Sequence, residues 1–136
     1  MLLVFRVTAV VHTLAFFMQP VLAGMFLSGQ DSAIAMHRAN ATIVTTICLA
    51  LTVLAFLAWR RQLIRRRLLA MLAAILLLEY VEMSLGGSHI LLVHIPLGVG
   101  LFATVVATLP MVMKAAPVAP QLSLTRERAF AEETVS

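Results

Sequence analysis

The sequence has little charge for its length and almost no cysteine. Its 136 residues include 10 Lys and Arg and 6 Asp and Glu, against 62% hydrophobic residues. Soluble domains carry about a quarter charged residues, and a soluble globule this small could not cover its surface with so few. A water-soluble monomer is therefore excluded. The one cysteine, Cys48, excludes an intramolecular disulfide and a cluster of thiolate metal ligands.

The motifs of the common soluble enzymes are also missing. The sequence contains no Ser-His-Asp order, no phosphate loop, no glycine-rich nucleotide loop and no Cys-x-x-Cys. These absences leave a hydrolase, a kinase or an NAD enzyme without support, and they favour a non-catalytic protein. A pI near 10.7 is typical of nucleic-acid binding, but the placement of the basic residues indicates a membrane partner instead.

Long apolar stretches dominate what is present. Crossing a hydrocarbon core about 30 Å thick takes roughly 20 helical residues. Stretches of about this length cover residues 7–27, 36–59, 68–85 and 90–113, and none alternates with the period of a strand. They predict an all-α integral membrane bundle of four helices in up-down-up-down order. The breaks between them are SGQDSA at 28–33, the charged RRQLIRRR at 60–67 and GGS at 86–88.

Arginines mark the side of the membrane on which each break lies. Five of the 10 Lys and Arg lie in the break at 60–67, Arg6 precedes the first stretch and Lys114 follows the last. By the positive-inside rule, this break and both termini are cytoplasmic, with lipid head groups as partners of the arginines. The arginine-rich inner break favours a bacterial cytoplasmic membrane. We expect no nucleic-acid partner.

The two ends of the chain need separate interpretation. Residues 21–23 (VLA) resemble a signal-peptidase site, but the preceding run is long and contains His12 and Gln19, so we expect a retained first helix. After residue 113 the composition changes, with Pro117 and Pro120 followed by mixed charge. We expect a flexible cytoplasmic tail over 114–136, with a short helix over 124–133.

Polar side chains inside apolar spans are costly unless they are paired or solvated, so each is a candidate for function. The set contains all four histidines and two acidic residues, with Arg38 beside one histidine: His12, His37, Arg38, Glu79, Glu82, His89 and His94. His12 and Glu79 both lie near the middle of their spans. We expect them to pair as a structural clasp, with a proton relay or second cofactor ligand as the alternative.

Two histidines are predicted to lie at the same depth. His37 opens the second span and His94 lies one turn inside the fourth, so their depths differ by only about 5 Å at the rise of a helix. The second and fourth helices of such a bundle are commonly diagonal across the core. Two histidines facing each other there can hold a haem iron from both sides. Arg38 suits a haem propionate, and Gly86, Gly87, Gly98 and Gly100 leave room for a flat ring or for close helix contact.

The residues in this region resemble those of a known enzyme family. The order of the matching residues is Gln19 and Gly24, then His37-Arg38, then Met83-Ser84-Leu85-Gly86-Gly87, then His94. Over residues 10–112 this order resembles one four-helix half of haem A synthase, and also small uncharacterised bacterial four-helix membrane proteins. The resemblance implies that His37 and His94 are haem ligands. Because the second half and the outer cysteines of the synthase are absent, it favours binding of haem b over synthesis of haem A.

The leading hypothesis is therefore a b-type haem-binding membrane protein that serves electron transfer or haem handling, with quinone or a respiratory complex as partner. A second hypothesis is a cofactor-free accessory subunit of a membrane complex, held together by interhelical hydrogen bonds. A third is a small proton or metal transporter that uses His12, Glu79 and Glu82 and forms a homo-oligomer.

Three further possibilities concern the outer side of the bundle. Glu82 is expected to pair with Arg38 or with a histidine, or to act as a proton-active or cation-binding carboxylate. His89 lies in a turn, where a solvated role is the simplest reading. Together with His37 and His94, these two residues form an alternative zinc or copper site with N and O donors.

Overall fold

The computed structural model describes residues 1–116, and all of its regular structure in that range is helical. The helices are α1 (Leu2–Leu27), α2 (Ser32–Arg60), α3 (Arg66–Gly87) and α4 (Leu91–Met113). Each is long and apolar enough to cross a membrane, and in a bilayer a helix satisfies all of its own backbone polar groups. The all-α prediction is confirmed, and the four apolar helices mark a multi-pass membrane protein.

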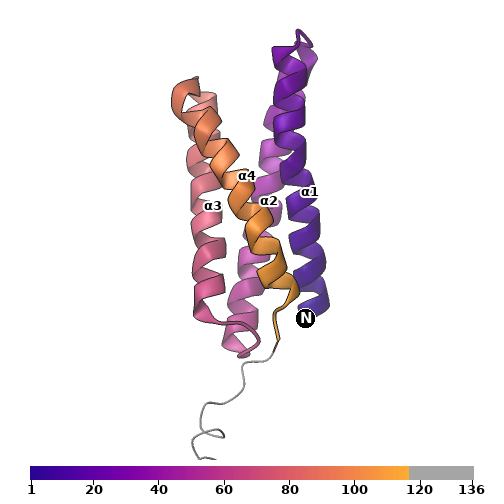
Figure 1. Ribbon diagram of the computed structural model, residues 1–136, viewed down its shortest axis with the longest axis vertical. Helices are drawn as coiled ribbons and strands as arrows, with labels where there is room; N and C mark the ends of the chain where they lie inside the picture. The colour runs from indigo at the N-terminus through magenta and orange to yellow at the C-terminus, as the bar shows by residue number, and fades with distance from the viewer. Residues whose placement is uncertain (117–136) are drawn as a thin grey trace, which may run out of the picture.

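The four helices form a closed ring of neighbours. Contacts join α1 to α2, α2 to α3, α3 to α4 and α4 back to α1, which makes α1/α3 and α2/α4 the diagonal pairs. The prediction that the second and fourth helices are diagonal is confirmed. Figure 1 shows the turns at 28–31 and 88–90 at one end, called here the turn end. The 61–65 loop and the N-terminus lie at the opposite, basic end.

The helices extend beyond the apolar stretches from which they were predicted. We expected the first at residue 7 and the second at residue 36, whereas α1 begins at Leu2 and α2 at Ser32. A helix continues past the hydrocarbon region as long as its backbone hydrogen bonds are met, so apolar length gives only a lower limit. The predicted helix over 124–133 and most of the predicted tail lie outside the described residues. At the start of that tail, Ala115 is buried and its carbonyl accepts a hydrogen bond of 2.8 Å from Arg6.

All three connections close with the same backbone device. A residue with positive φ follows each of α1, α2 and α3: Gly29 at 92°, Gln62 at 58° and His89 at 58°. The next amide then bonds back to a carbonyl five residues earlier, at 3.1, 2.9 and 2.9 Å. This is the left-handed cap that satisfies the last carbonyls of a helix and reverses the chain tightly. Such short reversals keep the ends of consecutive helices together.

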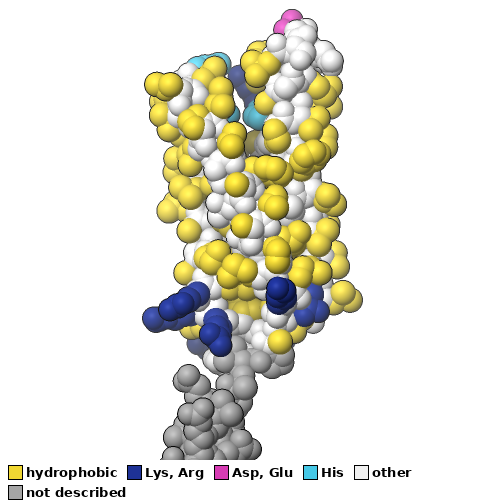
Figure 2. All heavy atoms as spheres, viewed as in Figure 1, with side chains coloured by type: hydrophobic (Ala, Val, Ile, Leu, Met, Phe, Trp, Pro, Cys, Tyr) yellow, Lys and Arg dark blue, Asp and Glu magenta, His cyan; other side chains and the backbone are white. Residues whose placement is uncertain are grey.

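The surface and the interior differ little in polarity. Figure 2 shows apolar side chains along the whole length of the visible face, with most of the visible Lys and Arg side chains at the basic end. Leu3 and Leu92 are 71% and 89% exposed, which suits contact with lipid rather than water. The interior combines large and small side chains, such as Phe5 and Phe16 on α1 with Ala55 and Ala58 on α2.

Candidate functional site

A buried histidine and a buried glutamate meet in the middle of the bundle. Nε2 of His12 lies 2.8 Å from Oε1 of Glu79, and the two residues are 2% and 3% exposed. The expected pairing of these residues is confirmed. They come from α1 and α3, a diagonal pair of helices, so the contact crosses the interior of the bundle rather than joining neighbours.

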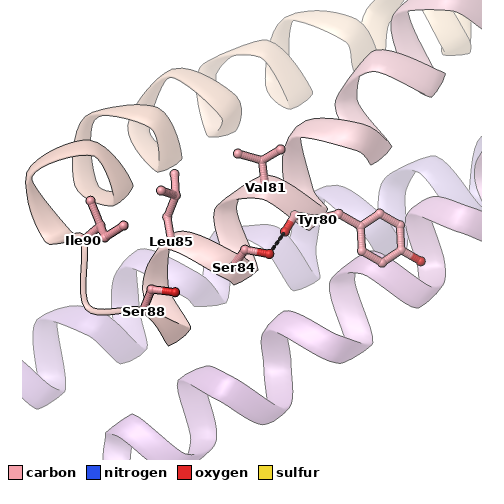
Figure 3. A pocket seen from close by; sticks show the side chains of 6 residues that line it. All are labelled: Tyr80, Val81, Ser84, Leu85, Ser88 and Ile90. Carbon is pink, nitrogen blue, oxygen red and sulfur yellow. Dashed lines mark hydrogen bonds between the residues drawn. The ribbon is translucent and has the colours of Figure 1, made fainter.

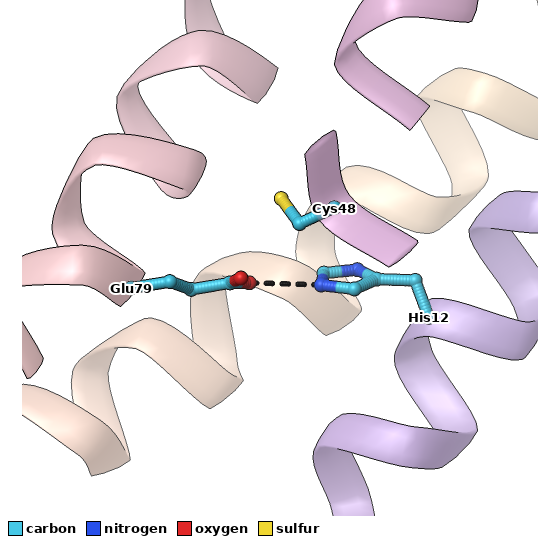
Figure 4. Close-up of side chains that lie close together, drawn as sticks. All are labelled: His12, Cys48 and Glu79. Atoms are coloured by element: carbon cyan, nitrogen blue, oxygen red, sulfur yellow. Dashed lines mark hydrogen bonds and ion pairs between the residues drawn. The ribbon is translucent and has the colours of Figure 1, made fainter. Parts of the chain in front are cut away.

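Cys48 completes this cluster from α2. Its Sγ and the ligand atoms of His12 and Glu79 all lie within 4.8 Å of one another, and Cys48 is fully buried. Figure 4 shows the three side chains converging from three helices. We call them the buried trio. Sequence reasoning missed Cys48, although its distance from the basic end matches that of the other two residues. Counted from the helix ends there, His12 lies ten residues after Leu2, Cys48 twelve before Arg60 and Glu79 thirteen after Arg66.

A second histidine–glutamate pair lies nearer the turn end. Nδ1 of His94 is 2.9 Å from Oε1 of Glu82 and 3.1 Å from the Glu82 carbonyl oxygen. Both of these oxygens are acceptors, so Nδ1 carries the proton and donates it, which leaves the Nε2 lone pair of a neutral His94 available. Of the two predicted partners of Glu82, the structure selects the histidine.

Two glycines make this pair possible. A Cβ built on Gly86 would lie 2.9 Å from Cε1 of His94, and one on Gly98 would lie 2.7 Å from Oε1 of Glu82. Neither distance is sterically acceptable, so both side chains rest against bare backbone. Gly87 and Gly100 have nothing within 4 Å of such a Cβ. These glycines were expected to leave room for a flat ring or for close helix contact. At Gly86 this room is filled by His94, and at Gly98 it is filled by Glu82.

His37 lies opposite His94. The two imidazole rings come from the diagonal helices α2 and α4, with centroids 6.2 Å apart and planes at 81°. Nδ1 of His37 is 3.2 Å from the main-chain oxygen of Gln19. When its amide is oriented to suit its neighbours, the Gln19 side chain accepts from the Ala41 amide at 2.8 Å. Its nitrogen can then donate to the His37 carbonyl at 3.2 Å and to Nδ1 of the His37 ring at 2.9 Å. Gln19 therefore fixes the start of α2 and the position of the His37 ring.

The other predicted site residues lie apart from these contacts. Arg38 is exposed beside His37, and His89 is exposed in the α3–α4 turn. In residues 1–116 the buried trio is the group of three or more metal-binding side chains whose ligand atoms lie within 4.8 Å of one another. The predicted zinc or copper set of Glu82, His89, His94 and His37 does not form such a group.

The surface next to the turn end has a shallow depression of about 380 Å³ on α3 and the following turn. Figure 3 shows its lining side chains, among them Tyr80, Ser84 and Ile90. The hydroxyl of Ser84 donates to the Tyr80 carbonyl within the helix, at 3.0 Å. No acidic or histidine side chain lines the depression, so it contributes no ligand to either cluster.

The fold and these contacts define a class: a four-helix membrane bundle with one sealed and one partly open histidine–glutamate cluster. No family model, no curated protein and no solved structure matches the chain. The resemblance to haem A synthase therefore stays a prediction that rests on the residues quoted for it.

Proposed function

We propose that this chain binds one b-type haem through His37 and His94 and serves electron transfer or haem handling in a bacterial cytoplasmic membrane. In this proposal the bundle crosses the membrane in up-down-up-down order. The basic end, with the arginine-rich loop and both termini, faces the cytoplasm. The two histidines then lie toward the outer face.

The proposal is carried by the opposition of the two imidazole rings across the bundle. Metal–nitrogen bonds of about 2 Å to two Nε2 atoms place the ring centroids roughly 6 Å apart. The observed separation is 6.2 Å. The rings also lie in the range of edge-to-face aromatic contacts, so the haem assignment depends on the histidine variants described below.

The hydrogen bonds of the His94 ring suit ligation through Nε2. A metal-bound histidine usually donates its other ring N–H to a carbonyl or a carboxylate, which orients the ring and raises its basicity. His94 donates Nδ1–H to Glu82. Nδ1 of His37 faces two groups of Gln19, the main-chain oxygen at 3.2 Å and the side-chain nitrogen at 2.9 Å, and ligation through Nε2 requires that it donate to the first. Among residues 1–116, neither Nε2 atom has a hydrogen-bond partner in this arrangement.

The surroundings of the pair also fit a flat anionic cofactor. Figure 2 shows histidine side chains beside a notch between the two halves of the turn end. His37 and His94 are only partly buried, and the neighbouring Arg38 is exposed. A guanidinium at this level would bind a propionate by charge-assisted hydrogen bonds.

The chemistry that a bound haem supplies is one-electron transfer at its iron. The protein would hold the group through His37 and His94, with the Glu82 side chain hydrogen-bonded to the His94 ring. A quinone or a respiratory complex would be the redox partner in the membrane.

Histidine variants test this assignment. The full chain is expressed with haem supplied, purified in detergent and assayed for haem per chain and for low-spin absorption. His37→Ala and His94→Ala should each abolish the six-coordinate low-spin spectrum, whereas the matched control His89→Ala should retain it. Normal spectra in both ligand variants would refute the assignment. A wild-type chain without haem would favour a cofactor-free accessory subunit.

A further inference from the structure

The buried trio holds more donors than a hydrogen-bonded clasp needs. Oε1 of Glu79 has a partner in His12, but Oε2 has none among the described residues, although it is buried. In a membrane interior, a carboxylate oxygen without a partner is strongly disfavoured. The Cys48 thiol comes to the same point from a third helix. A clasp between His12 and Glu79 leaves this oxygen unused, and the Cys48 thiol, which lies within hydrogen-bonding reach of Glu79 and Thr52, offers the carboxylate only a weak donor.

The three donors match one class of cation. Imidazole nitrogen, thiolate sulfur and carboxylate oxygen together are ligands of Zn²⁺, whereas the oxygen-only sites of Mg²⁺ and Ca²⁺ use no sulfur. Donors around a tetrahedral Zn²⁺ lie roughly 3.5 Å apart. The three ligand atoms already lie within 4.8 Å of one another. To reach this geometry, the widest of these separations would have to close by at most about 1.3 Å.

Charge balance points the same way. A divalent cation with one thiolate, one carboxylate and one neutral imidazole gives a site of zero net charge, which is the least costly arrangement away from water. The three residues are at most 3% exposed. Binding displaces the proton of the Cys48 thiol, which leaves to solvent, and no redox step is involved.

We propose that His12, Cys48 and Glu79 bind one Zn²⁺-class divalent cation in the middle of the bundle and so lock α1, α2 and α3 together. The second oxygen of Glu79, buried and without a hydrogen-bond partner among the described residues, would give the fourth bond. This site is independent of the proposed haem site, because the two share no residue. Since the site is sealed, the cation enters as the bundle folds.

Cobalt reports on this site directly, because a thiolate bound to Co²⁺ gives a charge-transfer absorption in the near ultraviolet. The full chain is produced in medium with Co²⁺ replacing Zn²⁺, purified, and measured for metal per chain and for absorption. We expect about one Co²⁺ per chain and a thiolate band. Cys48→Ser, which preserves the size of the side chain, should lose the band, and its metal content per chain should fall at least tenfold. Glu79→Gln keeps a side chain of the same shape and should also lose metal.

Two controls separate this site from the haem site. His37→Ala and His94→Ala should keep the cobalt band, and Cys48→Ser should keep any bound haem. Circular dichroism of Cys48→Ser checks that the helices are intact. The proposal is overturned if the wild-type chain contains no stoichiometric metal, or if its metal content and absorption are unchanged in folded Cys48→Ser.

Discussion

The two histidine–glutamate pairs use the same chemistry in different surroundings. Glu79 and Glu82 are three residues apart on α3, and each binds a histidine of another helix at 2.8 and 2.9 Å. The side chains of the inner pair are 3% exposed, whereas those of His94 and Glu82 are 19% and 14% exposed. Burial therefore separates the two pairs: the inner pair is sealed inside the bundle, and the outer pair is partly open near the turn end.

Breaking the inner pair should have the largest effect on stability. His12→Ala leaves the Glu79 carboxylate buried without its partner, which costs about 3–5 kcal/mol. In metal-free protein, the double variant His12→Leu with Glu79→Leu removes both polar groups and should recover most of this loss. Thermal unfolding in detergent, followed by circular dichroism, measures both. If His12→Ala unfolds at the same temperature as His89→Ala, the inner pair is not the clasp described here.

Adding one methyl group at Gly86 tests whether haem binding needs the His94 ring in its observed position. Gly86→Ala would place Cβ 2.9 Å from the His94 ring, so the ring must move away from its position opposite His37. We expect haem affinity to fall roughly 10–100-fold, as when the support of a metal ligand is lost. The matched variant Gly87→Ala meets no atom within 4 Å and should bind normally. Equal haem titrations for the two variants would exclude a steric requirement at Gly86.

Removing the charge of Glu82 should affect function more than stability. Glu82→Gln keeps an oxygen that can accept from Nδ1 of His94, so the ring stays in place and the fold loses only about 1 kcal/mol. The lost negative charge no longer stabilises the oxidised iron, so the midpoint potential should rise by an amount on the order of tens of mV. A redox titration decides this, and an unchanged or lower potential would argue against a charged Glu82 beside the ligand.

The smallest effect is expected in the turn, away from both pairs. His89 has φ of 58°, a conformation that glycine adopts without the strain that a side chain causes. His89→Gly should stabilise the bundle by about 0.5–1 kcal/mol and leave haem binding unchanged. Lower thermal stability in this variant would mean that the imidazole of His89 makes a contact that the bundle needs.

Depth along the helices could be predicted from the sequence, but rotation about their axes could not. Apolar length and the rise per residue placed His37 opposite His94 and His12 beside Glu79. Whether a residue faces the interior or lipid depends on helix rotation, and helices that are apolar all round give no amphipathic signal for it. Cys48 was missed for this reason. The steric roles of Gly86 and Gly98 follow from side chains on other elements and have no local signature.

A dithionite-reduced minus air-oxidised absorption spectrum of the purified wild-type chain, expressed with haem supplied, tests the central claim most directly. Haem held by His37 and His94 predicts a sharp alpha band with a shifted Soret peak. A flat difference spectrum would contradict the proposal that the open pair at the turn end is a haem site.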